Sequence, residues 1–190
     1  MALLKSVVHI RTQGGRSRVF ALMLLLSSGP ALPAQTTAPP EYQVKAVYLF
    51  NFAQFVDWPA QAFPETQGAL IIGILGDDPF GSYLDETVRG EKANGRTLLV
   101  QRYRRVGEIK VCHVLFIGRS ESDRLEQIFA SLKGRGILTV GDVEDFALRG
   151  GMIRFVTEKG KIRMRINLEP VKAAGLTISS KLLRVAELKP

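Results

Sequence analysis

Two almost unbroken apolar runs constrain the fold of this chain more than any other feature. They are Ala69–Leu75 (ALIIGIL) and Val111–Ile117 (VCHVLFI). A strand that is apolar at successive positions must be buried on both faces, as in parallel sheets covered by helices on each side. The pattern also predicts a short helix over Phe80–Val88, a strand over Thr97–Tyr103 and an amphipathic helix over Glu121–Leu132. This alternation favours a parallel sheet.

A helix is expected before the first apolar run, from Glu41 to Val56. Asp57-Trp58-Pro59 follows it, and the proline prevents any continuation of the helix. Trp58 is expected to close the core at the helix end. The predicted apolar face has helical spacing and consists of Val44, Val47, Tyr48, Phe52 and Phe55. Leu49 and Phe50 widen this face.

The last third of the chain contains a predicted hairpin. Met152–Thr157 and Lys161–Leu168 flank the turn sequence Glu158-Lys159-Gly160. A short strand over Ile137–Val140 precedes the hairpin, and two helices over Pro170–Ala174 and Ser180–Glu187 follow it. The predicted fold is therefore an α/β three-layer sandwich. It has a mostly parallel sheet with helices on both faces, a C-terminal antiparallel hairpin, and a single domain over residues 41–190.

Residues 1–34 have the pattern of a signal peptide. Four basic residues and no acidic one precede or enter the apolar run Val19–Leu26, and small residues lead to Ala34. This run is far shorter than the roughly 20 residues that span a bilayer. The sequence therefore predicts cleavage near Ala34 and a soluble exported protein.

Charge and cysteine content exclude several classes of function. The chain has 26 basic and 18 acidic residues. Four of the basic residues lie in the leader, so the exported part carries a net charge of about +4. The basic residues are dispersed, which disfavours a nucleic-acid partner. Cys112 is the single cysteine, so no intramolecular disulfide can form, and its apolar neighbours predict a buried, inert thiol.

No enzyme or metal signature emerges from the remaining polar residues. Cys112 and His113 are adjacent in a predicted strand, so their side chains point to opposite faces and cannot form a dyad. A zinc site lacks ligands, and we predict no cofactor. Ser179-Ser180-Lys181 superficially resembles a serine–lysine pair, but its position at a helix start favours capping.

Three predicted strands end in a glycine followed by polar residues: Gly76-Asp77-Asp78, Gly118-Arg119-Ser120 and Gly141-Asp142. The carboxyl ends of parallel strands share one edge of a sheet, where ligands usually bind. The candidate partner- or ligand-binding residues are therefore Asp77, Asp78, Arg119, Ser120 and Asp142. The alternative is that these loops are tight turns and helix caps, with Ser120 as an N-cap that pairs with Asp123.

Several motifs in order resemble one family, the YfiR-like family of small periplasmic proteins. They are Tyr48–Phe52 with Phe55–Pro59, Cys112–Ile117, Leu138–Asp142, Gly150–Ile153, Ile166–Leu168, Ala174–Leu176 and Ile178–Leu183. The resemblance implies an α/β sandwich and a non-enzymatic repressor that binds the periplasmic segment of a membrane-bound GGDEF diguanylate cyclase. It also implies lower cyclic di-GMP and less biofilm formation.

The resemblance leaves further partners open. An outer-membrane lipoprotein that titrates the repressor and a homodimer remain candidates. Relatives carry cysteine pairs, whereas this chain has only Cys112. A different class of function is a periplasmic small-molecule-binding module that uses the crevice at Gly76, Gly118 and Gly141 and acts on another sensor.

Overall fold

Both apolar runs contain a central strand of one eight-stranded sheet, β2 (Leu70–Leu75) and β5 (Val114–Ile117), although β5 begins at Val114 and not at Val111 as predicted. The computed structural model describes residues 39–63 and 68–188, so the predicted leader at 1–34 lies outside the described residues. The strand order is β10-β8-β7-β6-β5-β2-β4-β3. The other strands are β3 (Lys92–Ala93), β4 (Arg96–Tyr103), β6 (Leu138–Gly141), β7 (Ile153–Glu158), β8 (Lys161–Ile166) and β10 (Glu187–Leu188).

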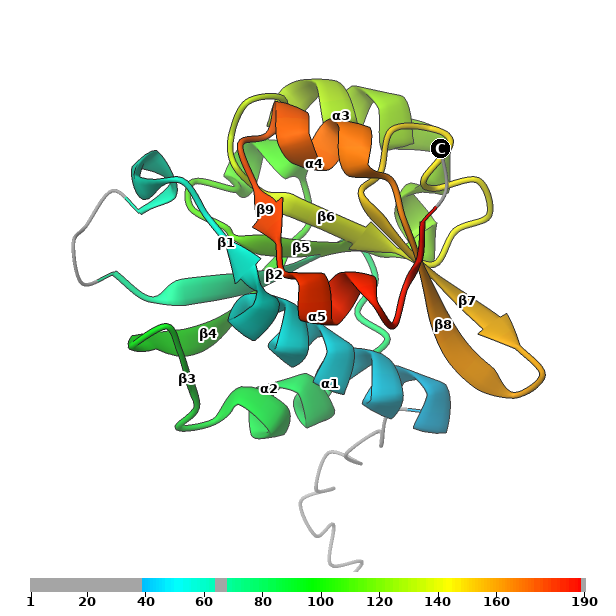
Figure 1. Cartoon of the computed structure of the whole chain (residues 1–190), viewed down its shortest axis with the longest axis horizontal. Coiled ribbons are helices and arrows are strands. Elements are labelled where there is room, and N and C mark those ends of the chain that lie inside the picture. The colour runs from blue at the N-terminus through cyan, green and yellow to red at the C-terminus, as the bar shows by residue number, and fades with distance from the viewer. Residues whose placement is uncertain (1–38, 64–67, 189–190) are drawn as a thin grey trace, which may run out of the picture. The chain divides into compact units, whose positions relative to one another are not determined.

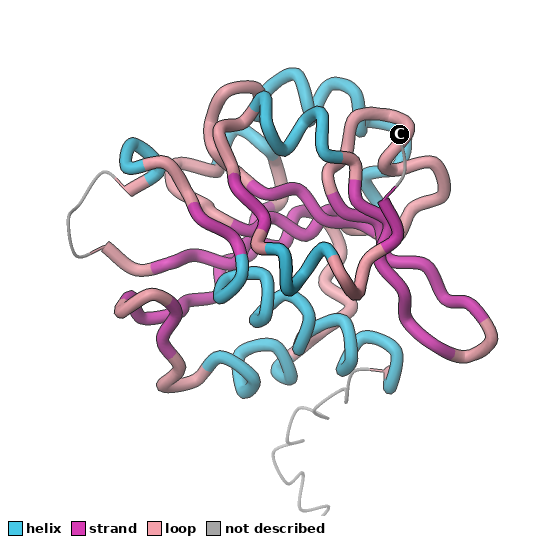
Figure 2. The backbone as a smooth tube through the Cα atoms, viewed as in Figure 1, coloured by secondary structure: helices cyan, strands magenta, loops and turns pink. Residues whose placement is uncertain are grey.

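The pairing within this sheet is mostly parallel. The neighbours from β7 through β6, β5 and β2 to β4 all run parallel, and β10 runs parallel to β8. Only the β7–β8 and β3–β4 pairs are antiparallel. The β7–β8 pair is the predicted hairpin, seen as the projecting strand pair in Figure 2. Its turn residues Lys159 and Gly160 have φ values of +51° and +72°, which suit a two-residue hairpin.

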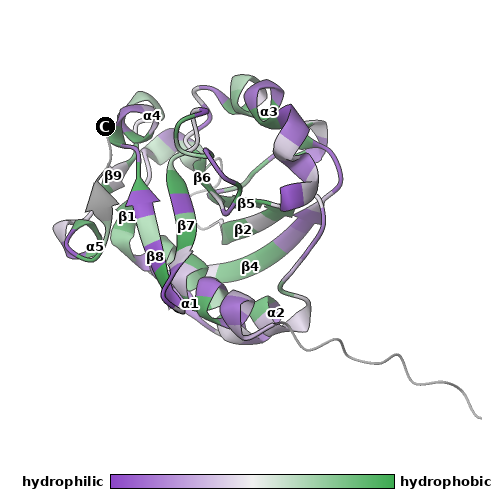
Figure 3. Ribbon diagram, turned by 90° about the vertical axis from the view of Figure 1, so that its right-hand side faces the viewer, coloured by the Kyte–Doolittle hydropathy of each residue, from purple (hydrophilic) through white to green (hydrophobic). Residues whose placement is uncertain are grey.

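Alternate residues of the central strands enter two separate cores. Ile72 and Ile74 of β2 join the core beneath α1 (Pro40–Phe55) and α2 (Ser82–Val88). Leu115 and Ile117 of β5 join the core beneath α3 (Leu125–Leu132). Figure 1 shows α1 and α2 on one side of the sheet and α3 on the other. In Figure 3 the central strands are largely green, while purple gathers in the surrounding loops and helices. The predicted three-layer α/β sandwich is confirmed.

The buried face of α1 differs from the prediction. Val44 and Val47 are 46% and 43% exposed, although the apolar spacing places them in the core. The buried residues instead form a neighbouring face of the helix and are Lys45, Ala46, Leu49, Phe52 and Ala53. Because Lys45 lies within this face, the buried residues do not form a continuous apolar pattern, and apolar periodicity does not predict the face. The prediction of that face was therefore partly wrong.

Short elements that the sequence did not predict join the two ends of the domain. β1 (Val56–Asp57) pairs antiparallel with β9 (Thr177–Ile178) beside the main sheet.

The remaining helices are α4 (Leu168–Ala173), α5 (Ser180–Leu183) and three 3₁₀ turns, η1 (Ala60–Ala62), η2 (Val106–Glu108) and η3 (Arg119–Arg124). The last predicted helix is too long, because α5 ends at Leu183 and the chain then enters β10.

Two local predictions concern the ends of helices. The Ser179 side chain accepts a hydrogen bond from the Leu182 amide, so the predicted capping role at the start of α5 is confirmed. Trp58 is only half-buried, and its indole Nε1–H donates to the His113 carbonyl at 3.1 Å.

Within residues 39–63 and 68–188, no helix combines the length and apolar character needed to cross a bilayer.

Candidate functional site

The glycine-ended strands come together as the sequence predicts. β2, β5 and β6 are adjacent and parallel, and Ile117 pairs with both Leu75 and Gly141. A glycine is required at position 118, because a Cβ there would lie 2.7 Å from the Asp77 carbonyl oxygen. The loops after these three strands therefore lie at one edge of the sheet. We call the five predicted site residues on these loops the strand-end residues.

Asp77 and Ser120 contact each other at the exposed part of this edge. The Asp77 amide donates to Ser120 Oγ at 2.9 Å, and both residues are exposed. The expectation that Ser120 caps the following helix, with Asp123 as its partner, was wrong. Arg119–Arg124 forms the 3₁₀ turn η3, which has no side-chain cap, and α3 begins only at Leu125. The Ser120 hydroxyl instead links two strand-end loops.

Asp78 has a separate set of partners. Its Oδ1 accepts the amides of Phe80 (2.7 Å) and Gly81 (3.3 Å), which fixes the turn before α2. Its Oδ2 accepts from Arg102 Nε at 2.7 Å, and Asp85 accepts from the same guanidinium. The hydrogen bond to Asp85 is the largest cause of the raised pKa of Arg102, and Asp78 adds to it. Asp78 thus stabilises a turn and an ion-pair network.

Asp142 lies at the centre of a buried polar cluster. Its carboxylate accepts from Lys45 Nζ at 2.5 Å, from the Tyr42 hydroxyl at 2.8 Å and from Arg119 Nε at 3.2 Å. Lys45 Nζ also lies 2.5 Å from Glu41 Oε1. The side chains of Lys45 and Asp142 are 1% and 2% exposed, whereas that of Arg119 is 66% exposed. We call these five residues, from α1 and two strand ends, the Lys45–Asp142 cluster.

The electrostatics of this cluster favour its charged form. Burial by itself raises the pKa of the Asp142 carboxyl, but the bonds from Lys45, Tyr42 and Arg119 outweigh burial and hold that pKa below its usual value. Burial and the bond to Asp142 raise the pKa of Tyr42 to about 12. The hydrogen bond to Asp142 likewise raises the pKa of Arg119. Two cations thus oppose two carboxylates, and only Arg119 presents most of its side chain to solvent.

The sequence of this chain matches a known protein family. A family model described as YfiR/HmsC-like matches residues 42–187, which include all the helices from α2 onward and most of α1. The chain belongs to the YfiR/HmsC-like family. This family is regulatory rather than catalytic, is periplasmic, and acts with membrane sensors in cyclic di-GMP signalling.

Two solved structures show weaker likeness to this YfiR-like chain. One is an ABC domain in complex with L-Trp from Streptococcus pneumonia, at 14% identity and a TM-score of 0.46 over 63% of this chain and 54% of that one. The other is a conserved domain protein from Vibrio cholerae, at 13% identity and a TM-score of 0.47 over 80% and 60%. This chain therefore spans a little over half the length of each. Likeness at these TM-scores carries no argument about function.

The two residues that most resemble catalytic groups in this YfiR-like chain are buried. Burial raises the pKa of the Cys112 thiol to about 12, and the predicted burial of this residue is confirmed. His113 Nδ1 accepts the Ile71 amide at 3.0 Å, and its ring stacks on Phe63. Burial lowers the pKa of His113 to about 4. Among the described residues, no three His, Cys, Asp or Glu side chains gather as a metal site requires.

The sequence did not reveal Lys45 and Tyr42 as partners of Asp142. Both lie in the first two turns of α1, about a hundred residues before Asp142 in the chain. The one local signal is a lysine within an otherwise apolar part of the helix. The structure thus joins Arg119 to Asp142 and Asp77 to Ser120, while Asp78 belongs to the Arg102 network.

Proposed function

We propose that this protein is a periplasmic repressor that binds the periplasmic segment of an inner-membrane GGDEF diguanylate cyclase and inhibits it. The observation that carries the proposal is the family match over residues 42–187. The predicted signal peptide, cleaved near Ala34, would deliver the protein to the compartment where that segment is accessible. Inhibition of the cyclase lowers cyclic di-GMP and reduces biofilm formation.

We further propose that the strand-end residues form part of the surface that contacts the cyclase. Arg119 supports this proposal, because its guanidinium is mostly exposed while Asp142 beneath it is buried and held by Lys45. An arginine that is already positioned loses less conformational freedom when a partner binds. Arginine is also enriched among the residues that dominate binding at interfaces. Asp77 and Ser120 add exposed polar groups beside it.

Gene deletion tests the repressor proposal directly. Loss of the gene should raise cyclic di-GMP and surface attachment, and the rise should disappear when the cyclase is deleted as well. Pull-down of the tagged protein from membranes should recover the cyclase, and the same experiment reports whether an outer-membrane lipoprotein or a second copy is bound. Unchanged cyclic di-GMP in the deletion strain, with the cyclase expressed, would contradict the proposal.

Substitution of Arg119 tests the surface. The Arg119→Ala variant should lose repression while its melting temperature stays nearly unchanged, because most of the side chain is in solvent. Arg184→Ala, also exposed, is the matched control and should keep full activity. If Arg119→Ala, Asp77→Ala and Ser120→Ala all repress normally, these loops serve only as turns.

The other function considered from the sequence is a small-molecule-binding module that acts on another sensor. The structure gives little support for such binding at the strand-end residues. The carboxylates of Asp78 and Asp142 are already bonded to neighbouring side chains and amides. A ligand at this edge would have to displace those bonds, which is costly for groups as buried as Asp142.

A further inference from the structure

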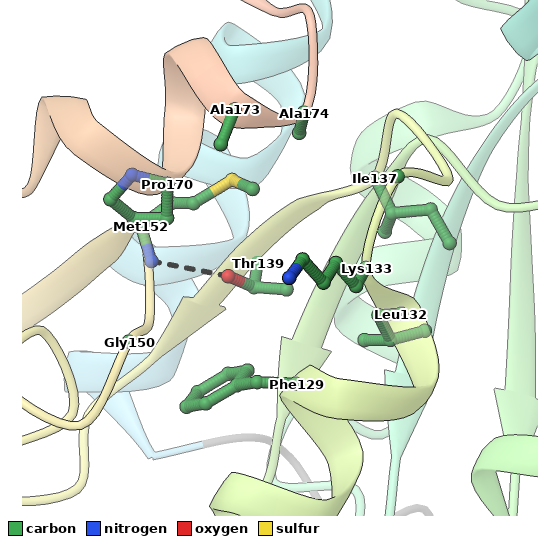
Figure 4. A pocket seen from close by; sticks show the side chains of 11 residues that line it. Phe129, Leu132, Lys133, Ile137, Thr139, Gly150, Met152, Pro170, Ala173 and Ala174 are labelled. Carbon is green, nitrogen blue, oxygen red and sulfur yellow. Dashed lines mark hydrogen bonds between the residues drawn. The ribbon is translucent and has the colours of Figure 1, made fainter.

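A cavity lies between the end of α3 and α4 (Figure 4). Its volume is 310 Å³, at the lower end of the range for small-molecule sites. Most of its wall is apolar and is formed by Phe129, Leu132, Ile137, Met152 and Pro170. None of the strand-end residues lines it, so the cavity is independent of the surface proposed above.

Two polar side chains line the cavity, Thr139 and Lys133, and each carries a hydrogen-bond donor. Thr139, only 3% exposed, accepts the Met152 amide at its Oγ1 at 3.1 Å. That bond uses the oxygen and leaves the hydroxyl hydrogen available. Lys133 follows the last turn of α3, and Figure 4 shows its side chain extending toward Thr139. Among the cavity-lining residues there is no carboxylate.

Lys133 has no carboxylate partner among the side chains that the structure describes. No carboxylate within residues 39–63 and 68–186 forms an ion pair with its ammonium group. A cation and a hydroxyl donor that line one apolar cavity complement an anionic oxygen pair. An amine would meet the repulsion of the Lys133 charge. A ligand that is apolar throughout would leave the Thr139 donor without an acceptor.

We propose that this cavity binds a small carboxylic acid in its ionised form. The carboxylate accepts hydrogen bonds from Lys133 Nζ and Thr139 Oγ1. The apolar body, aromatic or aliphatic, packs against Phe129, Leu132 and Met152. The assignment does not depend on the identity of the cyclase, because binding can be measured with this protein alone.

The two methionines of the described chain provide an internal pair of reporters. Met152 lines the cavity, whereas Met164 is buried in β8 and does not line it. In the full chain labelled with ¹³C at the methionine methyls, 3-phenylpropionate should shift the Met152 resonance saturably and leave that of Met164 in place. The isosteric amide, 3-phenylpropionamide, should bind roughly tenfold more weakly or worse, because it lacks the charge. Octanoate in place of 3-phenylpropionate distinguishes an aliphatic from an aromatic body.

Lys133→Gln should weaken 3-phenylpropionate binding by roughly tenfold or more and bring the acid and the amide to similar affinity. Lys133 is exposed, so its loss should not affect folding. Lys172→Gln, an exposed lysine of α4 that does not line the cavity, is the matched control and should bind normally. The proposal fails if neither acid shifts Met152 at millimolar concentration. It also fails if the amide binds as well as the acid, or if Lys133→Gln binds unchanged.

Discussion

The Lys45 ammonium and the Asp142 carboxylate lie 2.5 Å apart, and their side chains are 1% and 2% exposed. This ion pair connects α1 to the loop that follows β6, across 97 residues of sequence. Two unpaired charges at these positions would be very costly, because both side chains are almost completely buried. Each residue is therefore required mainly because the other is present.

Removal of one member of this pair should be strongly destabilising. Asp142→Ala leaves Lys45 buried with only Glu41 as a counter-charge, and Lys45→Met leaves Asp142 with only Arg119. We expect each change to lower the free energy of unfolding by about 3–5 kcal/mol. Urea denaturation of the two variants measures this loss.

The double variant Lys45→Met/Asp142→Ala should lose much less than the sum of the two single changes, because neither charge is then left unpaired. Asp77→Ala, at an exposed carboxylate of the same sheet edge, is the control and should stay within about 0.5 kcal/mol of the wild type. Additive losses in the double variant would mean that Lys45 and Asp142 are not energetically coupled.

The sequence predicts the central sheet well, since the information for it is local. The apolar runs of β2 and β5 identify strands covered on both faces, and glycines mark where these strands end. β1 and β9 could not be predicted in this way, because two-residue strands have no detectable periodicity. Their pairing is decided by tertiary contacts between the ends of the domain.

The candidate site is predictable only in part. The rule for parallel strands correctly gathers the loops that contain Asp77, Arg119 and Asp142 at one edge. It gives no information on which helix packs over that edge, so Lys45 was missed. The failure at Ser120 has another cause. Its spacing suits an N-cap, but the chain forms a 3₁₀ turn there and the hydroxyl accepts the Asp77 amide instead.

Gly73 in the middle of β2 should not tolerate a side chain. A Cβ at this position would lie 2.7 Å from Cys112 Sγ and 2.8 Å from Tyr103 Cε2, both in the core beneath α3. Gly73→Ala should therefore lower the free energy of unfolding by about 1–3 kcal/mol through overpacking. Thermal and urea denaturation measure the effect.

Gly107→Ala is the control for this change, because no atom lies within 4 Å of a Cβ built there. Combining Gly73→Ala with Cys112→Ala should recover part of the lost stability, since removal of the sulfur makes room for the new methyl group. If the Cys112→Ala background gives no recovery, the crowding does not come from the thiol.

Trp58 should contribute to stability through both its ring and its indole N–H. The Trp58→Ala variant removes the edge contact with the His113 ring and the hydrogen bond to the His113 carbonyl. We expect a loss of about 3 kcal/mol in the free energy of unfolding, at the low end for an aromatic residue because the ring is only half-buried. Trp58→Phe keeps a ring and should lose about 1 kcal/mol, the contribution of one hydrogen bond. Equal losses in the two variants would argue against a packing role for the ring.

His113 should make the protein less stable as the pH falls below neutrality. Burial lowers the pKa of its folded form to about 4, from 6.5 for a free histidine. The unfolded chain therefore binds a proton that the folded chain excludes, and stability is fully present above pH 6.5 and is lost as the pH falls toward 4. The full shift corresponds to about 3 kcal/mol over this interval. His9 is the other histidine and lies in the predicted leader, so without the leader His113 is the main side chain that gains a proton on unfolding between pH 6.5 and 5. Urea denaturation in this window should show stability rising with pH, and His113→Asn, which keeps an acceptor for the Ile71 amide, should flatten the slope. An equally steep slope in His113→Asn would assign the dependence to carboxylates instead.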